Sequence, residues 1–289
     1  MTIYSGRIID SHQHFWKMSR GDYDWLTPDL TILYRDFLPA DYSILAEELG
    51  IVQSILVQAA ATEEETIYLL GLAEENDFIA GVVGWVDMEK PSSTVTKRLE
   101  MFSSFPFFKG IRPMLQDIED VDWILNPSFS PVFEQLVKLD LTFDALVHVE
   151  HLENIFYIAS RFPTLRVVID HCAKPNIASQ KFDIWAKKLK MFVKTENVYI
   201  KISGLTTEAN ANQMNADNYK RYIEHVRDVF GSERIMWGSD WPVVNLKSAT
   251  SQWMDLTNEL VADWSPEEIE NIFVNSVRTF YQINNIKSK

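Results

Sequence analysis

Two histidines stand one residue apart near the start of the chain, directly after a short apolar run. They are His12 and His14 in "IIDSHQHFWK", residues 8–17, and the chain holds only six histidines in all. If the run is a strand, side-chain alternation places both imidazoles on the same side. Paired imidazoles can bind a cation or polarise a substrate. The pair is therefore the first indication of a functional site.

Further side chains that can do chemistry stand at or near the ends of later apolar runs. They are Lys109, Arg112, Asp144, His148, His171, Lys201, Ser203 and Asp240. A cation buried inside a strand is costly unless it meets an anion or a ligand oxygen. Because a guanidinium matches a carboxylate or a carbonyl, we expect Arg112 to bind substrate. Lys109 has two interpretations, a substrate contact or an ion pair with Asp144, and for Lys201 we favour an ion pair.

The runs themselves are short and rich in β-branched residues, which is typical of strands. They cover residues 7–10, 52–60, 79–87, 107–115, 141–148, 165–171, 198–205 and 234–240. Apolar residues recur at helical spacing over 63–76, 130–140, 154–162, 182–193, 218–230, 253–264 and 266–283. This alternation over 289 residues predicts an α/β fold, a (β/α)₈ barrel in preference to an open doubly wound sheet. No repeat or Pro/Gly-rich linker divides the chain, so we expect one domain over 1–289.

In a closed barrel the carboxyl ends of all strands meet at one face. Side chains as far apart in sequence as His12 and Asp240 then become neighbours around a single pocket. The long irregular stretch at about 15–40 follows the first strand, where loops shape such a pocket. Its aromatic residues have two interpretations, a roof over the pocket or packing of the loop onto the barrel. They are Trp16, Tyr23, Trp25 and Tyr34.

Composition narrows the possible partners. The net charge of −14 and the pI near 4.9 argue against nucleic acid and anionic membranes as partners. No apolar run approaches the roughly 18 residues of a membrane span, and the N-terminus lacks a signal-peptide pattern. With Cys172 as the single cysteine, we expect a cytoplasmic protein without disulfides. The oligomeric state has no signature in the sequence.

Four motifs in this order resemble a known family. They are the His-x-His of residues 12–14, "FKGIRPMLQD" at 108–117, "DHCAKP" at 170–175 and "WGSDWP" at 237–242. Together they resemble the amidohydrolase superfamily, and within it the sugar-lactonase branch of L-fuconolactonase- and L-rhamnonolactonase-like enzymes. The resemblance covers essentially the whole chain. Fold and reaction class transfer on such a resemblance better than the identity of the substrate.

The resemblance implies hydrolysis of a sugar lactone to its acid. By position, Asp240 matches the aspartate that acts as general base on the attacking water. His12, His14 and His171 match histidines that bind a metal or polarise the lactone carbonyl. One divalent ion, zinc, held by these histidines and Asp240, and catalysis without a metal are the two alternatives. Two metals are not expected, because the middle strands offer only Lys109 and His148 of the binuclear pattern.

Around these residues we expect the substrate to be bound by Arg112, Lys109, His148, Trp25 and Gln58, with Gln116 as a further hydroxyl binder. Two other functions stay open: a zinc-dependent decarboxylase of the same superfamily, and a non-enzymatic sugar-acid binding protein. Each residue also has a structural interpretation. The histidines could be satisfied core residues, and Asp240 could cap the segment after it.

Overall fold

Eight parallel strands build the molecule in the computed structural model, which describes residue 4 and residues 6–283. They lie side by side in chain order and are β1 Ile8–Gln13, β2 Ile51–Val57, β3 Ile79–Gly84, β4 Phe108–Ile111, β5 Thr142–Ala145, β6 Val167–Ile169, β7 Val198–Ile202 and β8 Ile235–Trp237. The segment after β8 returns to β1, because Asp240 N donates to His12 O at 2.8 Å and His14 N to Trp241 O at 2.7 Å. These bonds close the barrel, which confirms the predicted (β/α)₈ fold.

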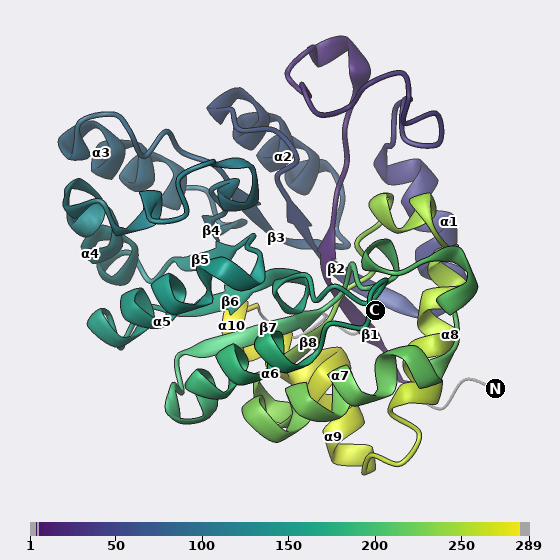
Figure 1. Ribbon diagram of the computed structural model, residues 1–289. Coiled ribbons are helices and arrows are strands. Elements are labelled where there is room, and N and C mark those ends of the chain that lie inside the picture. Colours follow the sequence, from purple (N-terminus) through teal and green to yellow (C-terminus); the bar gives the residue numbers. More distant parts are fainter. Residues whose placement is uncertain (1–3, 5, 284–289) are drawn as a thin grey trace.

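Helices surround the barrel and follow the strands one by one (Figure 1). They are α1 Pro39–Leu49, α2 Glu63–Glu75, α3 Ser92–Ser103, α4 Ser130–Lys138, α5 Leu152–Arg161, α6 Asp183–Leu189, α7 Ala216–Phe230, α8 Thr250–Leu260, α9 Pro266–Glu270 and α10 Ser276–Tyr281. Their apolar stripes face the strands, as in α7, where Tyr222 and Val226 are fully buried. Gly231, with φ 65°, follows the last residue of α7.

Two predicted helices are interrupted. The stretch 182–193 forms α6 and then a 3₁₀ turn over Lys190–Lys194, since the Arg234 guanidinium donates to the carbonyls of Phe192 at 3.3 Å and Thr195 at 2.9 Å. The stretch 266–283 contains a π-helical turn between α9 and α10. There the Asn271 amide donates to Ser232 Oγ at 3.0 Å, which ties the turn to the segment before β8.

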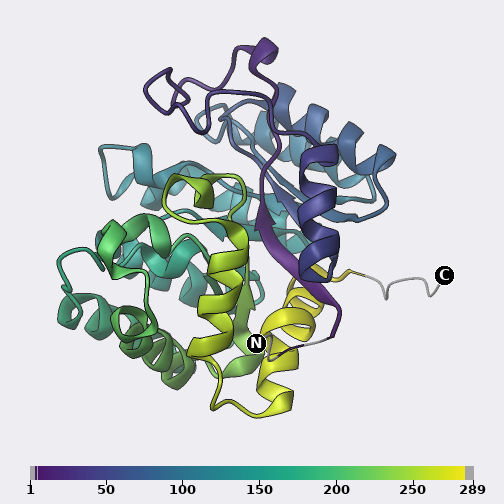
Figure 2. The same ribbon diagram turned by 90° about the vertical axis from the view of Figure 1, so that its right-hand side faces the viewer.

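The stretch between β1 and α1 projects above the carboxyl end of the barrel, opposite α9 and α10 (Figure 2). Its two ends are joined, because Trp16 and Phe37 exchange backbone hydrogen bonds of 3.0 Å. The Trp16 ring packs edge-on against Trp25 at 5.4 Å between ring centroids. The two interpretations of these aromatic residues each hold for one residue. Trp16 packs the loop onto the barrel, whereas Trp25 lines the cavity described below. Tyr34 is 44% exposed and roofs nothing.

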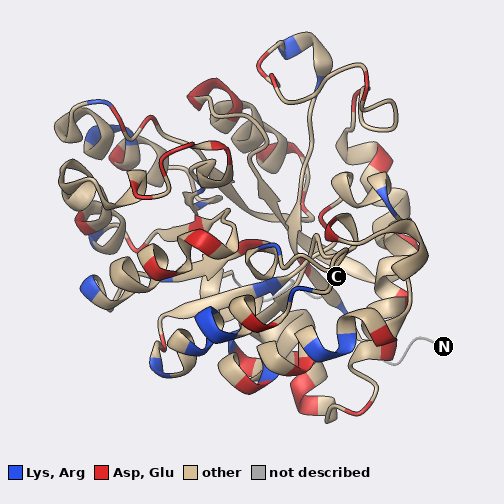
Figure 3. Cartoon of the chain, viewed as in Figure 1, with Lys and Arg blue, Asp and Glu red and all other residues tan. Residues whose placement is uncertain are grey.

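Acidic and basic side chains are interspersed around the helices (Figure 3). Among the described residues, no helix is both long and apolar enough to cross a bilayer.

Candidate active site

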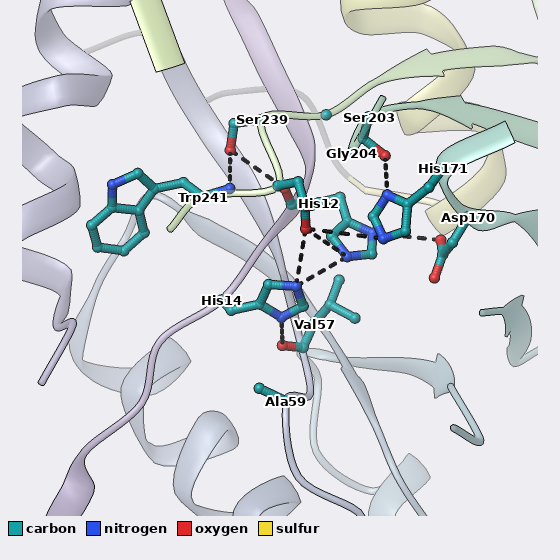
Figure 4. Close-up of polar contacts among 12 residues, drawn as sticks. His12, His14, Val57, Ala59, Asp170, His171, Ser203, Gly204, Ser239 and Trp241 are labelled. Carbon is teal, nitrogen blue, oxygen red and sulfur yellow. Dashed lines mark hydrogen bonds and ion pairs between the residues drawn. The ribbon is translucent and has the colours of Figure 1, made fainter. Parts of the chain in front are cut away.

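His12 and His14 leave β1 on the same side, as the period of two predicts, and both are buried. Their Nε2 atoms lie 3.2 Å apart. His14 Nδ1 lies 2.8 Å from the carbonyl oxygen of Val57 at the end of β2, so this nitrogen carries the proton and donates it to the carbonyl. The other nitrogen, Nε2, faces His12 Nε2 and Asp240 Oδ1. Figure 4 shows the two rings with His171 approaching from another strand.

Asp240, after β8, lies at the centre of these histidines. Its Oδ1 atom is 3.4 Å from Nε2 of His14, 3.8 Å from Nε2 of His12 and 4.0 Å from Nε2 of His171. The ligand atoms of His12, His171 and Asp240 all lie within 4.8 Å of one another. The structure thus brings together the four residues that the sequence suggested, from β1, β6 and β8. His14 is not part of this group of three, although its Nε2 atom is the nearest of the histidine nitrogens to Asp240 Oδ1.

A buried aspartate fixes the first strand relative to the last. Asp10 Oδ1 accepts from the backbone nitrogens of His12 at 3.0 Å and Ser239 at 2.9 Å, and its Oδ2 accepts from the Tyr42 hydroxyl at 2.7 Å. Because these bonds join β1 to the segment that carries Asp240, they set the distance between the histidine pair and the carboxylate.

His171 begins a run of four left-handed residues without a glycine. The φ angles of His171, Cys172, Ala173 and Lys174 are 53°, 53°, 57° and 49°. Each such residue costs roughly 1–2 kcal/mol, so the surroundings must hold the run in place. The Trp185 indole donates to the Cys172 carbonyl at 2.6 Å, and His171 Nδ1 lies 2.8 Å from Ser203 Oγ. Cys172 is buried in the packing below the site, as expected.

Gly204 permits the close approach of His171 and Asp240. Its φ is 60°, and a Cβ atom there would lie 2.6 Å from Nδ1 of His171 and 3.1 Å from Oδ2 of Asp240. A side chain would force one of these groups to move, and the left-handed backbone also disfavours one. Glycine is therefore required by the geometry of the site.

The charge states of the cluster follow from burial and from its own contacts. Burial lowers the pKa of His171 to about 4, and burial together with the Lys201 ammonium lowers that of His12 well below its ordinary value. Burial alone would raise the pKa of Asp240, but His171, the hydrogen bond with His14 and the charge of His12 outweigh it and hold that pKa below its ordinary value. At neutral pH the site therefore presents the Asp240 carboxylate beside the neutral imidazoles of His12 and His171.

Beneath the cluster lies a fully buried ionic network. The Lys201 ammonium is 2.6 Å from Asp144 Oδ2, 3.0 Å from Asp170 Oδ1 and 3.2 Å from His12 Nδ1. The Tyr281 hydroxyl, at the end of α10, donates to Asp144 Oδ2 at 2.5 Å. The predicted ion pair of Lys201 is thus present, and it is Lys201, not Lys109, that pairs with Asp144.

Arg112 is held beside the cluster by Gln58. The guanidinium donates to the Gln58 carbonyl, while the Gln58 side-chain amide donates to the Arg112 carbonyl at 2.6 Å. Arg112 NH1 lies 3.6 Å from Asp170 Oδ2 and 3.5 Å from His12 Nε2. Within the described residues its Nε is buried without a hydrogen-bond partner. Arg112 therefore still has a donor to offer.

A cavity of about 300 Å³ opens above these groups. It is lined by His14, Trp25, Leu30, Ala59, Arg112, Met114, Gln116, Asp117, Leu146, His171, Lys174, Thr207, Glu208, Asp240, Val243 and Leu246. A larger hollow of about 620 Å³ beside α5 has neither histidine nor aspartate among its lining residues.

Only some of the proposed substrate-binding residues line this cavity. Trp25, Arg112 and Gln116 line the cavity. Gln58 and Lys109 are not among its lining residues: Gln58 acts on Arg112, and Lys109 lies near the start of β4, where Arg166 and Asp140 are its charged neighbours. The expected contact of Lys109 with substrate is therefore not supported, because its charged neighbours Asp140 and Arg166 precede β5 and β6, at the amino ends of the strands.

His148 lies outside the lining, at the edge of the cavity. Burial lowers its pKa, and the charges of Lys174 and Asp117, which do line the cavity, act on it. The sequence did not suggest four of the polar lining residues: Asp117, Lys174, Thr207 and Glu208. Asp117 and Lys174 had a usable signal, since they stand in "FKGIRPMLQD" and "DHCAKP"; the other two follow β7 in a turn without a motif.

Three histidines and a carboxylate thus lie at the base of a cavity, at the carboxyl ends of the barrel strands. This arrangement is typical of hydrolytic enzymes that activate water. Residues 9–283 match the family model described as amidohydrolase, and the chain belongs to this family.

Its relatives agree with this assignment. The chain is 42% identical over 238 residues to an L-fucono-1,5-lactonase of Burkholderia ambifaria, covering 82% of this chain and 81% of the relative. It is 33% identical over 271 residues to an L-fucono-1,5-lactonase of Burkholderia multivorans, covering 90% and 89%. The crystal structure of an amidohydrolase from Burkholderia multivorans with bound zinc superposes with a TM-score of 0.88 at 30% identity, covering 96% of this chain and 100% of that one. A 5-carboxyvanillate decarboxylase from Sphingomonas paucimobilis, 14% identical with a TM-score of 0.65, shares the fold alone.

Proposed function

We propose that the protein hydrolyses the ring ester of a sugar 1,5-lactone to the aldonic acid. The observation that carries the proposal is the ionised Asp240 carboxylate, buried among three histidines at the base of a cavity large enough for a sugar. The lactonase names of the two Burkholderia relatives support it. A decarboxylase has no comparable support, because the decarboxylase structure resembles this chain in fold only.

In this reaction Asp240 is the general base. Its Oδ1 accepts a proton from water as the water oxygen attacks the lactone carbonyl, and the proton then passes to the ring oxygen as the C–O bond breaks. Lactone and water thus give the hydroxy acid. Because a low pKa makes the Asp240 carboxylate a weak base, the carbonyl must also be polarised. The Arg112 guanidinium and the imidazoles of His14 and His171, which all line the cavity, are placed for this task.

We further propose that one divalent ion, zinc, binds to His12, His171 and Asp240. Three protein ligands with one open position are typical of catalytic zinc, and neutral imidazoles beside a carboxylate are the required donors. A zinc ligand at His12 Nε2 needs its proton on Nδ1, which lies 3.4 Å from Asp170 Oδ1 and 3.2 Å from the Lys201 ammonium; the proton then points to Asp170, and the ammonium keeps its contacts with Asp144 and Asp170. When bound, the ion would stabilise the oxyanion and acidify water.

The test is proton release from a panel of aldonolactones, including L-fucono-, L-rhamnono- and D-galactonolactone, in weak buffer with spontaneous hydrolysis subtracted. Asp240→Asn should lower turnover by at least about two orders of magnitude, in line with the loss of a positioned base. Asp255→Asn, on the exposed face of α8, is the matched control. If the folded protein, supplied with zinc, hydrolyses no lactone of the panel, the proposed lactonase activity is refuted. If Asp240→Asn keeps full activity, Asp240 is not the general base.

We place the reaction in the cytoplasm, with a small-molecule lactone as the partner and the barrel of 1–289 as one domain. The single buried cysteine supports a reducing compartment, and the net charge of −14 suits an uncharged sugar lactone better than a polyanion.

A further inference from the structure

Two opposite charges face the cavity without touching each other. Lys174 ends the left-handed run after β6, and Glu208 ends the 3₁₀ turn Thr206–Glu208 after β7. Both line the cavity. Across the described residues, no carboxylate oxygen comes within 4.0 Å of the Lys174 ammonium, and neither side chain forms a hydrogen bond within the protein.

The two side chains are nevertheless close enough to act on each other. Burial raises the pKa of the Glu208 carboxyl, and the Lys174 ammonium lowers it. Opposite charges on the wall of a half-buried cavity gain when a bound polar group contacts both. A hydroxyl meets this need, since it donates to a carboxylate and accepts from an ammonium.

Apart from Met114 after β4 and Leu146 after β5, the polar and apolar side chains of the wall lie on different loops. The loops after β4, β6 and β7 contribute Gln116, Asp117, Lys174, Thr207 and Glu208. The loops after β8, β1 and β2 contribute Trp25, Leu30, Ala59, Val243 and Leu246. The indole N–H of Trp25 is already bonded to the Ala59 carbonyl at 2.7 Å, so this half of the wall offers few free donors. A sugar lactone bound here would turn its hydroxyls towards the first half and its carbon face towards the second.

We propose that Lys174 and Glu208 form a hydroxyl-binding subsite that selects polyhydroxylated lactones. One substrate hydroxyl donates to Glu208, and the same or a neighbouring hydroxyl accepts from Lys174, while the carbonyl end lies at Asp240 and Arg112. A lactone without these hydroxyls leaves both half-buried charges without a partner in the bound state and is therefore disfavoured. The subsite deepens the proposed lactonase function and rests on it.

The experiment compares kcat/KM on a polyhydroxylated 1,5-lactone, on its monodeoxy analogues and on unsubstituted δ-valerolactone. We expect Lys174→Met and Glu208→Gln each to lower the ratio of sugar lactone to δ-valerolactone by about tenfold to a hundredfold, the usual effect of one lost charged hydrogen bond. Removing the contacted hydroxyl from the substrate should lower kcat/KM of the wild type far more than that of either variant. Lys97→Met and Glu74→Gln, on the exposed faces of α3 and α2, are the matched controls.

Thermal unfolding of each variant checks that it folds, and Lys174→Gln replaces Lys174→Met if the left-handed position does not accept methionine. A ratio that stays unchanged, or that falls equally in the controls, overturns the subsite. Equal activity of the wild type on all deoxy analogues overturns it as well. If the wild type hydrolyses no lactone, the proposed function fails, and the subsite is then tested by calorimetric binding of the aldonic acid. Binding that Lys174→Met weakens would support the subsite. Binding that Lys174→Met leaves unchanged would overturn it.

Discussion

Replacing Lys201 by methionine tests whether the network beneath the site stabilises the fold. Methionine keeps much of the apolar stem of lysine but removes the charge. The ammonium lies 2.6 Å from Asp144 Oδ2 and 3.0 Å from Asp170 Oδ1, and all three side chains are fully buried. The variant therefore leaves two carboxylates in the barrel interior without their shared cation.

Removing one partner of a buried ion pair costs about 3–5 kcal/mol. Here Asp170 keeps Arg112 NH1 at 3.6 Å, and Asp144 keeps the Tyr281 hydroxyl, so the remaining contacts offset part of the loss. We expect the free energy of unfolding to fall by about 4 kcal/mol at pH 7. Burial already raises the pKa of Asp144, and without the ammonium it rises further, so protonation at lower pH should relieve the cost.

Urea unfolding of both proteins at pH 7 and pH 5, followed by circular dichroism, measures this difference. Lys201→Met combined with Asp144→Asn should recover part of the lost stability, because the unpaired charge on Asp144 is then absent. If the free energy of unfolding falls by less than about 1 kcal/mol at pH 7, or by the same amount at both pH values, the Lys201 ammonium does not neutralise the buried carboxylates of Asp144 and Asp170.

Three further results are expected. Gly204→Ala should lower turnover by at least about tenfold, since a methyl carbon 2.6 Å from His171 Nδ1 displaces a group by which the substrate is positioned; wild-type rates in a folded variant would contradict this. The contribution of Glu65 to stability should fall by up to about 3 kcal/mol as pH rises from about 4.5 to about 7, because burial raises the pKa of Glu65 from 4.5 to about 7 and the folded state binds the extra proton in that window; the difference in unfolding free energy between the wild type and Glu65→Gln should change by this amount over the window, and a constant difference would contradict it. Dialysis against a chelator should abolish turnover and zinc should restore it; an unaffected rate would leave carbonyl polarisation to Arg112 and the histidines.

The strand order and the convergence of the site residues could be predicted because they depend on local patterns. A period of two placed His12 and His14 on the same side, and barrel closure placed Asp240 beside them. The roles of Lys109 and Lys201 could not be separated in this way. Both are lysines within apolar runs, but Lys109 is near the start of β4 and Lys201 near the end of β7, so they lie towards opposite ends of the barrel.

Two other features were beyond local reasoning. The left-handed run from His171 to Lys174 contains no glycine, so residue preferences argue against the conformation that tertiary contacts impose. The side chain of Glu208 faces the cavity because of a short 3₁₀ turn that has no sequence motif.

The pairing of β1 with the segment after β8 also sets the order in which the site can appear during protein synthesis. The first strand emerges with His12 and His14, but the backbone partners on its open edge are Asp240 and Trp241, which are translated nearly two hundred and thirty residues later. Tyr281, the hydroxyl partner of Asp144, emerges later still. A nascent chain that ends before Asp240 carries an unpaired strand edge and lacks the carboxylate that we propose as general base, so it must be kept from aggregating, and on this proposal it cannot act on substrate. Activity therefore begins only when nearly the whole chain has left the ribosome.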